Sequence, residues 1–286
     1  MRSPGCRRPP RVATRTADGF LGQQDDRELV FATYLAPCLQ PVYEFVAARV
    51  GERLHRPSRL IVGKSLDEVR QAEVDFAFLC GLPYVRLKRD NAGVEALAAP
   101  IVQGERYEER PIYFSDLIVP AHSPATAFAD LRGRSWAYNE PDSHSGYLIT
   151  LSTLVEMGET PAFFERWEMT GLHQESIRRV AAAEVEGSAV DSHVLAVELR
   201  DHPELAEQIR VIGTLGPSTI QPLVATAAVG LALRADVTEI VAGLGSIAAE
   251  RDRLSAGLVE RFVAIDDSAY ADIRSRLHGV ETAGFA

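Results

Sequence analysis

The sequence predicts an α/β fold of two similar lobes with a ligand cleft between them. Strand-like apolar runs alternate with helix-like amphipathic runs, a pattern typical of βαβ units and parallel sheets. A weak internal echo at a spacing of 111 residues relates helix–strand–turn segments of the two halves, for example Ala72-Glu73-Val74 and Ala183-Glu184-Val185. Equivalent turns in two facing lobes would point into one cleft, because ligands of open α/β sheets lie outside the carboxyl ends of the strands.

The elements of the first lobe follow this alternation in order. Residues 28–34 form a short apolar run that predicts a buried strand, and residues 42–54 have the pattern of an amphipathic helix. Residues 59–62 predict a second strand and residues 66–72 a short helix. Residues 74–79 predict a third, buried strand that ends at a turn.

Extended segments return in the middle and near the end of the chain. Residues 111–120 form a long extended run, after which a second βα series begins near residue 130. Residues 210–212 predict another strand, residues 213–222 contain two glycines and two prolines, and residues 223–226 are extended again. The remainder, to about residue 276, has a mainly helical pattern.

Composition argues against several functional classes. The 286 residues are 46% hydrophobic and 24% charged, as in ordinary globular proteins. A net charge of −10 disfavours a general nucleic-acid binder. It leaves room for a local anion site, because helix termini and hydroxyl groups carry no formal charge. No apolar run approaches the roughly 18 residues that suggest a membrane-spanning helix.

The cysteines and the first residues of the chain add few constraints. Cys6, Cys38 and Cys80 lack metal-ligand spacing and the sequence has no cofactor motif, so we expect neither a metal nor a cofactor. Cys80 lies in an apolar run, and we expect it to be a buried, small hydrophobic residue. Residues 1–26 carry arginines and prolines without a following apolar segment, which predicts a disordered leader and no recognisable secretory signal.

The most informative motif is a polar turn between the strand-like residues 135–138 and a helix that begins near Leu148. It holds two hydroxyl groups and an imidazole, in the run Ser143, His144, Ser145, Gly146 and Tyr147. The first N–H groups of a helix lack a partner inside it, and the helix dipole adds partial positive charge there. The turn therefore predicts an anion site that needs no lysine or arginine, although an ordinary helix N-cap stays open as the alternative.

Other polar residues precede helices or follow strands, and parallel strands would bring them to the same edge. His173, Asp191 and Ser192 lie before predicted helices, Tyr34 ends a strand, and Tyr84 follows a turn. Imidazole, phenol and hydroxyl groups can donate hydrogen bonds to an oxyanion. Asp191 only accepts, so it suits a ligand that still carries a donor, such as a protonated oxygen, an amine or a hydroxyl.

Each of these residues also has a structural interpretation. His173 can begin a helix and bond a nearby carbonyl, Asp191 can cap the following helix, and the tyrosines can be core aromatics. A metal site of His144, His173 and Asp191 is disfavoured, because no two of them have helical i, i+4 spacing. Ser143, His173 and Asp191 superficially resemble a catalytic triad, but the neighbouring donors favour binding over nucleophilic catalysis.

In this order the residues resemble the PhnD-like phosphate/phosphonate substrate-binding components of ABC transporters, over about residues 29–270. The similarity is carried by residues 74–81 with Tyr84, residues 130–133, residues 143–147, Gly171 with His173, and Asp191-Ser192. It implies a type II periplasmic binding protein fold, in which two α/β lobes are joined by two crossing strands and close over ligand. The crossings would lie near residues 114–119 and 216–224. The implied division is a leader over 1–26, lobe 1 over 27–114 and 219–286, and lobe 2 over 115–218.

The resemblance also implies site roles. In the family, a Ser-Thr-Ser-Gly turn and a later histidine hold the phosphonyl or phosphate oxygens, which corresponds here to Ser143, His144, Ser145 and His173. The cleft tyrosines correspond to Tyr34 and Tyr84, and the acidic residue that meets the rest of the ligand corresponds to Asp191. The chain departs from the family pattern at His144, where Thr is usual, and at Ala183 and Glu186, where Gly and Asp are common.

Together these features predict a solute-binding protein that captures a small oxyanion by reversible lobe closure, with an ABC permease as partner. Phosphate, phosphite, a phosphonate and an organophosphate are the expected ligand classes. No catalytic residue and no nucleic-acid partner is expected. A cytoplasmic lyase-like enzyme or a cytoplasmic sensor on the same fold are the alternatives. The unrecognised export signal keeps both of them open, and with them the compartment.

Overall fold

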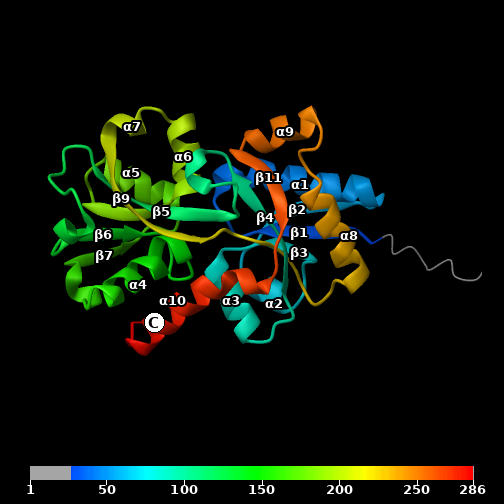
Figure 1. The fold of residues 1–286 in the computed structure, drawn as a ribbon, viewed down its shortest axis with the longest axis horizontal. Helices are drawn as coiled ribbons and strands as arrows, with labels where there is room; N and C mark the ends of the chain where they lie inside the picture. Colours follow the sequence, from blue (N-terminus) through cyan, green and yellow to red (C-terminus); the bar gives the residue numbers. More distant parts are fainter. Residues whose placement is uncertain (1–26, 286) are drawn as a thin grey trace, which may run out of the picture.

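The computed structural model describes residues 27–285 and is an α/β structure with two mixed sheets covered by helices (Figure 1). The predicted leader over residues 1–26 lies outside the described residues. In Figure 1 one sheet lies on the right with α1, α8 and α9, and the other lies on the left with α4 to α7. No helix in the described part of the chain is long and apolar enough to cross a membrane.

The first sheet has six strands. In spatial order they are β11 (Val259–Ala264), β4 (Glu95–Val102), β10 (Leu223–Ala225), β3 (Phe76–Phe78), β1 (Leu29–Thr33) and β2 (Ser58–Val62). β1 pairs in parallel with both β2 and β3, as the alternation of strands and helices predicts. β10, by which the chain returns from the other sheet, runs antiparallel to β3 and β4, and β11 runs antiparallel to β4.

The second sheet has five strands. Their order is β7 (Arg166–Met169), β6 (Ser135–Tyr138), β8 (Gly187–Asp191), β5 (Ile112–Pro120) and β9 (Ile209–Thr219). β6 is parallel to β7 and β8, whereas β5 is antiparallel to β8 and β9. The expectation of parallel sheets is therefore right for the strands that lead to the polar turns and wrong for the long strands that join the two sheets.

Helices cover both sheets. They are α1 (Gln40–Leu54), α2 (Asp67–Arg70), α3 (Gly81–Arg89), α4 (Ile149–Glu156), α5 (His173–Ala181), α6 (Ser192–Asp201), α7 (Leu205–Gln208), α8 (Leu231–Ala242), α9 (Ala248–Ser255) and α10 (Ala271–Thr282). The C-terminal α10 packs against both α3 and α4, so it contacts helices of the two sheets (Figure 1).

The chain crosses between the sheets twice, from β4 to β5 and from β9 back to β10, near the segments that the resemblance implies. The expected lobe boundaries at residues 114/115 and 218/219 fall inside β5 and β9, and the division itself stays a prediction. Three strands, β4, β7 and β11, are not predicted by the sequence pattern. The glycines and prolines over 213–222 do not end the extended run, because β9 continues through them to Thr219.

The central strands β1 and β3 of the first sheet are buried on both faces. Phe31 and Phe76 stack with ring centroids 4.8 Å apart on the face toward α1, whereas Ala32 and Ala77 face the opposite core beside Leu79. Burial on both faces explains why these strands read as continuous apolar runs in the sequence. The sheet thus forms a rigid base whose strand ends position polar residues.

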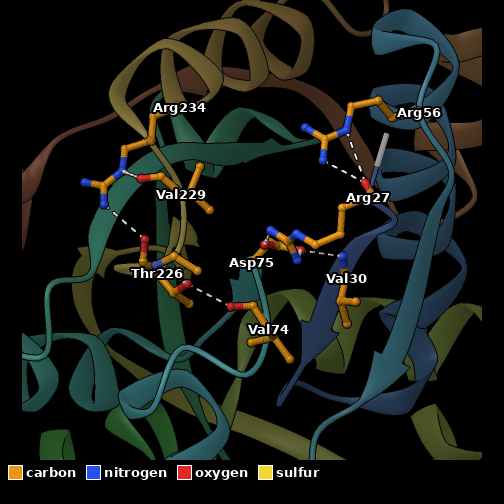
Figure 2. A network of polar contacts seen from close by, with 9 residues as sticks. Arg27, Val30, Arg56, Val74, Asp75, Thr226, Val229 and Arg234 are labelled. Carbon is orange, nitrogen blue, oxygen red and sulfur yellow. Dashed lines mark hydrogen bonds and ion pairs between the residues drawn. The ribbon is translucent and has the colours of Figure 1, made fainter. Parts of the chain in front are cut away.

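A polar network anchors β3 at the end remote from those strand ends (Figure 2). Asp75, which is buried, accepts hydrogen bonds from the Arg27 guanidinium at 2.5 and 3.1 Å and from the Val30 N–H at 2.8 Å. The Thr226 hydroxyl donates to the Val74 carbonyl at 2.7 Å, and Arg234 donates to the Thr226 carbonyl at 3.0 Å. Pairing satisfies a buried carboxylate that would otherwise strongly destabilise the fold.

The internal echo corresponds to a repeated structural unit. The units α2–β3–α3 and α5–β8–α6 share helix-end geometry, since Ala72 and Ala183 both have a φ of 55°. Glu73 N–H donates to the Glu68 carbonyl at 2.8 Å, and Glu184 N–H donates to the Arg179 carbonyl at 2.9 Å. These are the bonds of a Schellman motif, which normally places glycine at the left-handed position.

We therefore expect Ala72→Gly and Ala183→Gly each to raise the free energy of unfolding by about 0.5–1 kcal/mol. Relief of left-handed strain at alanine outweighs the extra entropy that glycine gives the unfolded chain. Urea unfolding measures the change. Ala48→Gly, on an exposed position inside α1, is the control and should lower stability by about 1 kcal/mol. Destabilisation by all three substitutions would contradict the assignment.

Candidate functional site

The polar turn after β6 forms the centre of the site. It begins at Ser143 in extended conformation, continues as a π-helical turn over His144–Leu148, and leads into α4. The Ser143 hydroxyl oxygen accepts the Gly146 N–H at 3.0 Å, and the Ser143 carbonyl accepts the Leu148 N–H at 3.0 Å. Ser143 is thus a helix N-cap, and its hydroxyl proton is still available to an acceptor.

A neighbouring imidazole completes the turn. His173 begins α5 two residues after Gly171. The φ of 84° at Gly171 and the bond from its N–H to the Asn139 carbonyl at 2.7 Å bring the segment back toward the turn. The His173 Nε2 lies 3.1 Å from the Ser145 Oγ. Burial lowers the pKa of His173 to about 4, so its imidazole is neutral at physiological pH. The Ser145–His173 pair is therefore electrically neutral.

Asp191 lies at the end of β8, the strand next to β6 in the second sheet. Its Oδ1 accepts the His193 N–H at 2.8 Å and the Val194 N–H at 3.3 Å, which makes it the N-cap of α6. Its Oδ2 accepts the Gln221 side-chain amide at 2.5 Å. Burial raises the pKa of Asp191 to about 6 in spite of these donors. Asp191 consequently combines its structural role with a place on the cavity wall.

These residues surround a cavity of about 60 Å³. Of the predicted site residues, the structure brings five to its wall: Tyr34, Ser143, Ser145, His173 and Asp191. No lysine or arginine of the described residues lines it, and Asp191 and Glu140 are its carboxylates. Within residues 27–285 there is also no group of three or more His, Cys, Asp or Glu side chains that could hold a metal. Besides the two carboxylates, the cavity offers hydroxyls, a neutral imidazole and the side-chain amides of Asn139 and Gln221.

Four predicted residues of the turn and of α6, with Gly146 the fourth, are not on the cavity wall. His144 is fully buried behind the turn, where its Nε2 lies 2.8 Å from the Ser218 Oγ of β9, and burial lowers its pKa to about 3. Ser192 accepts the Phe114 N–H at 3.0 Å instead of facing the cavity. Tyr147 packs its ring 4.7 Å from that of Tyr138. His144 and Ser192 thus connect the site to the strands that join the sheets.

Gly146 also lies behind the wall, with its N–H committed to Ser143. A Cβ at this position would overlap the Asn139 Oδ1 and come within 3.2 Å of the His173 ring, so glycine permits a close approach to both residues.

The expectation that Tyr84 lies at the ligand site needs correction. Its ring is buried against Tyr270 at 4.8 Å, and its hydroxyl donates to Asp267 at 2.7 Å, away from the cavity.

Sequence reasoning misses several residues of the wall. Asn139, Glu140 and Gln221 contribute polar groups, and Cys80 lies there half-buried instead of in the core, with its sulfur accepting the His144 N–H at 3.3 Å. Burial raises the Cys80 pKa to about 11, so the thiol stays protonated. The remaining wall residues are Tyr43, Gly171 and five apolar residues, Leu35, Ala36, Leu39, Leu172 and Val194. Asn139 and Glu140 have a local signal, since they lie four and three residues before Ser143.

Comparisons with known proteins place this geometry in a family. The family model described as "ABC transporter, phosphonate, periplasmic substrate-binding protein" matches residues 30–270. A binding protein component of an ABC phosphonate transporter from Pseudomonas aeruginosa superposes with a TM-score of 0.78 at 18% identity, covering 90% of this chain and 87% of that one. PhnD1 from Prochlorococcus marinus, solved with methylphosphonate, gives a TM-score of 0.76 at 14% identity, covering 90% and 99%.

A more distant structural relative is the aliphatic sulphonate binding protein SsuA from Escherichia coli, with a TM-score of 0.59 at 13% identity, covering 89% of this chain and 86% of that one. The matched family and these neighbours are substrate-binding proteins of transporters and not enzymes, which implies a small ligand and a permease partner. This chain, with its two mixed sheets and a polar cavity, belongs to the family of periplasmic phosphonate-binding proteins of ABC transporters.

Proposed function

We propose that the protein binds a small phosphorus oxyanion reversibly in the 60 Å³ cavity and presents it to an ABC permease. Phosphate, phosphite, a phosphonate and an organophosphate are the ligand classes. The observation that carries the proposal is the convergence of Ser143, Ser145 and His173 on one cavity without a cationic side chain. Preorganised neutral donors at a helix start stabilise an anion without the desolvation of an opposing charge.

The donors are arranged so that their protons can face the ligand. Ser143 accepts from Gly146, which leaves its O–H to donate and polarises it for donation. With its proton on Nε2, His173 donates to the Ser145 oxygen and frees the Ser145 hydroxyl for the anion. Ser143 and Ser145 would therefore contact the oxyanion through their hydroxyls, and His173 would act on it indirectly by orienting the Ser145 hydroxyl.

We propose Tyr34 as part of the rim and not as a donor to the anion. Its hydroxyl already donates to Glu68 at 2.7 Å, and burial together with Glu68 raises its pKa.

Lobe closure would be completed by contacts, next to the turn, between segments that belong to the two different sheets. The Arg86 guanidinium of α3 pairs with Asp142, which directly precedes the turn, and the Cys80 sulfur accepts the His144 N–H. Ligand would favour this closed arrangement through its greater affinity for it.

Titration calorimetry of the full chain with phosphate, phosphite, methylphosphonate and sulfate tests the proposal. At least one phosphorus oxyanion should bind with unchanged chemical structure, as mass spectrometry of the recovered ligand would verify. Mass spectrometry of the purified protein under native conditions would identify any ligand that it retains. Failure of all phosphorus oxyanions to bind, or recovery of a converted product, would contradict reversible oxyanion binding.

Asp191→Asn should change ligand preference. The substitution removes a negative charge from the wall, so an oxyanion without a donor should bind more tightly and a ligand with an amine should bind about 10- to 100-fold more weakly. In the unaltered protein, affinity for the donor-free oxyanion should rise as the pH falls through about 6, because Asp191 becomes protonated. Calorimetry of both proteins across this range separates that rise from the ligand's own titration. The same pH dependence in Asp191→Asn would contradict the assignment.

A further inference from the structure

A second, outer cavity of about 620 Å³ adjoins the 60 Å³ cavity and shares part of its wall. The residues that line both are Tyr34, Leu35, Cys80, Glu140, Gly171 and Leu172. The inner cavity has room for roughly four to six non-hydrogen atoms, at about 10–15 Å³ for each water-sized group. A phosphoryl group of one phosphorus and three oxygens, with one attached atom, already has five non-hydrogen atoms. A longer substituent would then reach past the shared wall into the outer cavity.

The outer cavity differs from the inner one in charge. Four cationic side chains line it: Lys64, Arg70, Arg86 and Arg89. The three arginines are held in ion pairs with Asp67 and Asp90, with Asp142, and with Glu281, respectively. Within residues 27–285, no hydrogen bond or ion pair involves the Lys64 ammonium group. It is thus a cation that a ligand can approach without breaking an existing pair.

The surrounding structure fixes the position of Lys64 relative to the shared wall. Gly63 packs so closely on the Tyr34 ring that a Cβ at Gly63 would overlap it, and its N–H donates to the Thr33 carbonyl at 3.0 Å. Glu68 accepts both the Tyr34 hydroxyl at 2.7 Å and the Lys64 N–H at 3.2 Å. The Lys64 backbone therefore lies next to the Tyr34 ring, which lines both cavities.

We propose that the outer cavity is a second subsite, which receives the substituent of a phosphoryl ligand and pairs an anionic group on it with Lys64. This inference rests on the proposed function of the inner cavity. The ligand class is a phosphonate or phosphate monoester whose substituent ends in a carboxylate or a second phosphoryl group. The inner wall, with its two carboxylates and no cation, is unsuited to that second anionic group.

Calorimetry with methylphosphonate and phosphonoacetate, which share the phosphonyl group, tests the subsite. Phosphonoacetate should bind about two- to fivefold more tightly at low ionic strength, the range for a solvent-exposed ion pair, and this advantage should shrink with added salt. Lys64→Gln should abolish the advantage while methylphosphonate affinity stays unchanged. Lys88→Gln is the matched control, because it removes the same charge from α3 at a residue that lines neither cavity.

The outcomes separate the two proposals. If methylphosphonate binds but phosphonoacetate gains nothing, or if Lys64→Gln weakens both ligands alike, the subsite is overturned while oxyanion binding stands. A Lys88→Gln effect equal to that of Lys64→Gln would indicate general electrostatic attraction and would also overturn the subsite. If neither ligand binds the unaltered protein, oxyanion binding by the inner cavity fails and the subsite fails with it.

Discussion

Ser143→Ala is expected to weaken oxyanion binding by about 5- to 150-fold, which corresponds to roughly 1–3 kcal/mol. The substitution removes a hydroxyl donor from the cavity and also leaves the Gly146 N–H without its acceptor. Calorimetry measures the loss of affinity. Loss of the N-cap should in addition lower the free energy of unfolding by about 1 kcal/mol, as urea unfolding would show.

Two variants separate the cap from the donor. Ser143→Thr keeps a hydroxyl in both roles and should recover most of the affinity. Thr160→Ala removes another N-cap, whose hydroxyl oxygen accepts the Ala162 N–H at 3.3 Å and lies outside both cavities. It should lower stability with no effect on binding. Unchanged affinity in Ser143→Ala, or an equal loss in Thr160→Ala, would remove Ser143 from the proposed anion contacts.

The polar turn could be predicted because its chemistry is local. Its hydroxyls, glycine and helix start are contiguous, and the apolar runs on either side set the strand and helix that hold it. The echo of 111 residues was equally informative, since the same helix-end hydrogen bonds recur at Ala72 and Ala183. Short-range periodicity and turn chemistry therefore determine this part of the site.

Residues whose role depends on distant partners could not be assigned from the sequence. Tyr84 lies in the first turn of α3 and faces Tyr270 and Asp267, which no local pattern pairs with it. Gln221 reaches the cavity only because the chain crosses back between the sheets and brings its amide to Asp191. The same limit applies to β4, whose alanines and proline lack a strand pattern until β10 and β11 pair with it.

Buried histidines make the fold sensitive to acid. The free energy of unfolding is expected to fall steeply as the pH is lowered from about 6.5 toward about 5. Burial lowers the pKa values of His144, His173 and His193 from 6.5 to about 3, about 4 and about 4. Below pH 6.5 the unfolded chain binds protons at these residues, whereas the folded chain does so only at lower pH. Protonation therefore favours the unfolded state throughout this range.

Asp191 acts in the opposite direction. Its pKa is raised from 3.8 to about 6, so the folded chain binds this proton before the unfolded chain does, and stability gains from it as the pH falls below 6. Near pH 5 the unfolded state then holds about two more protons than the folded state across these four groups. That difference corresponds to a slope of roughly 3 kcal/mol per pH unit.

Urea unfolding at about pH 7, 6 and 5 measures this slope, and a histidine variant assigns it. The His193 Nε2 lies 2.5 Å from the Gly257 carbonyl, and His193→Gln keeps a donor for that oxygen while removing the titratable group. In His193→Gln the unfolded state should bind about one fewer extra proton relative to the folded state, and the slope should decrease in proportion. His202→Gln, at a half-exposed position, should leave the slope unchanged. Stability that is level between pH 7 and pH 5 would mean that the buried histidines are protonated in the folded protein. The neutral imidazole assigned to His173 at the proposed anion site would then be wrong as well, because the same burial lowers the pKa of both residues.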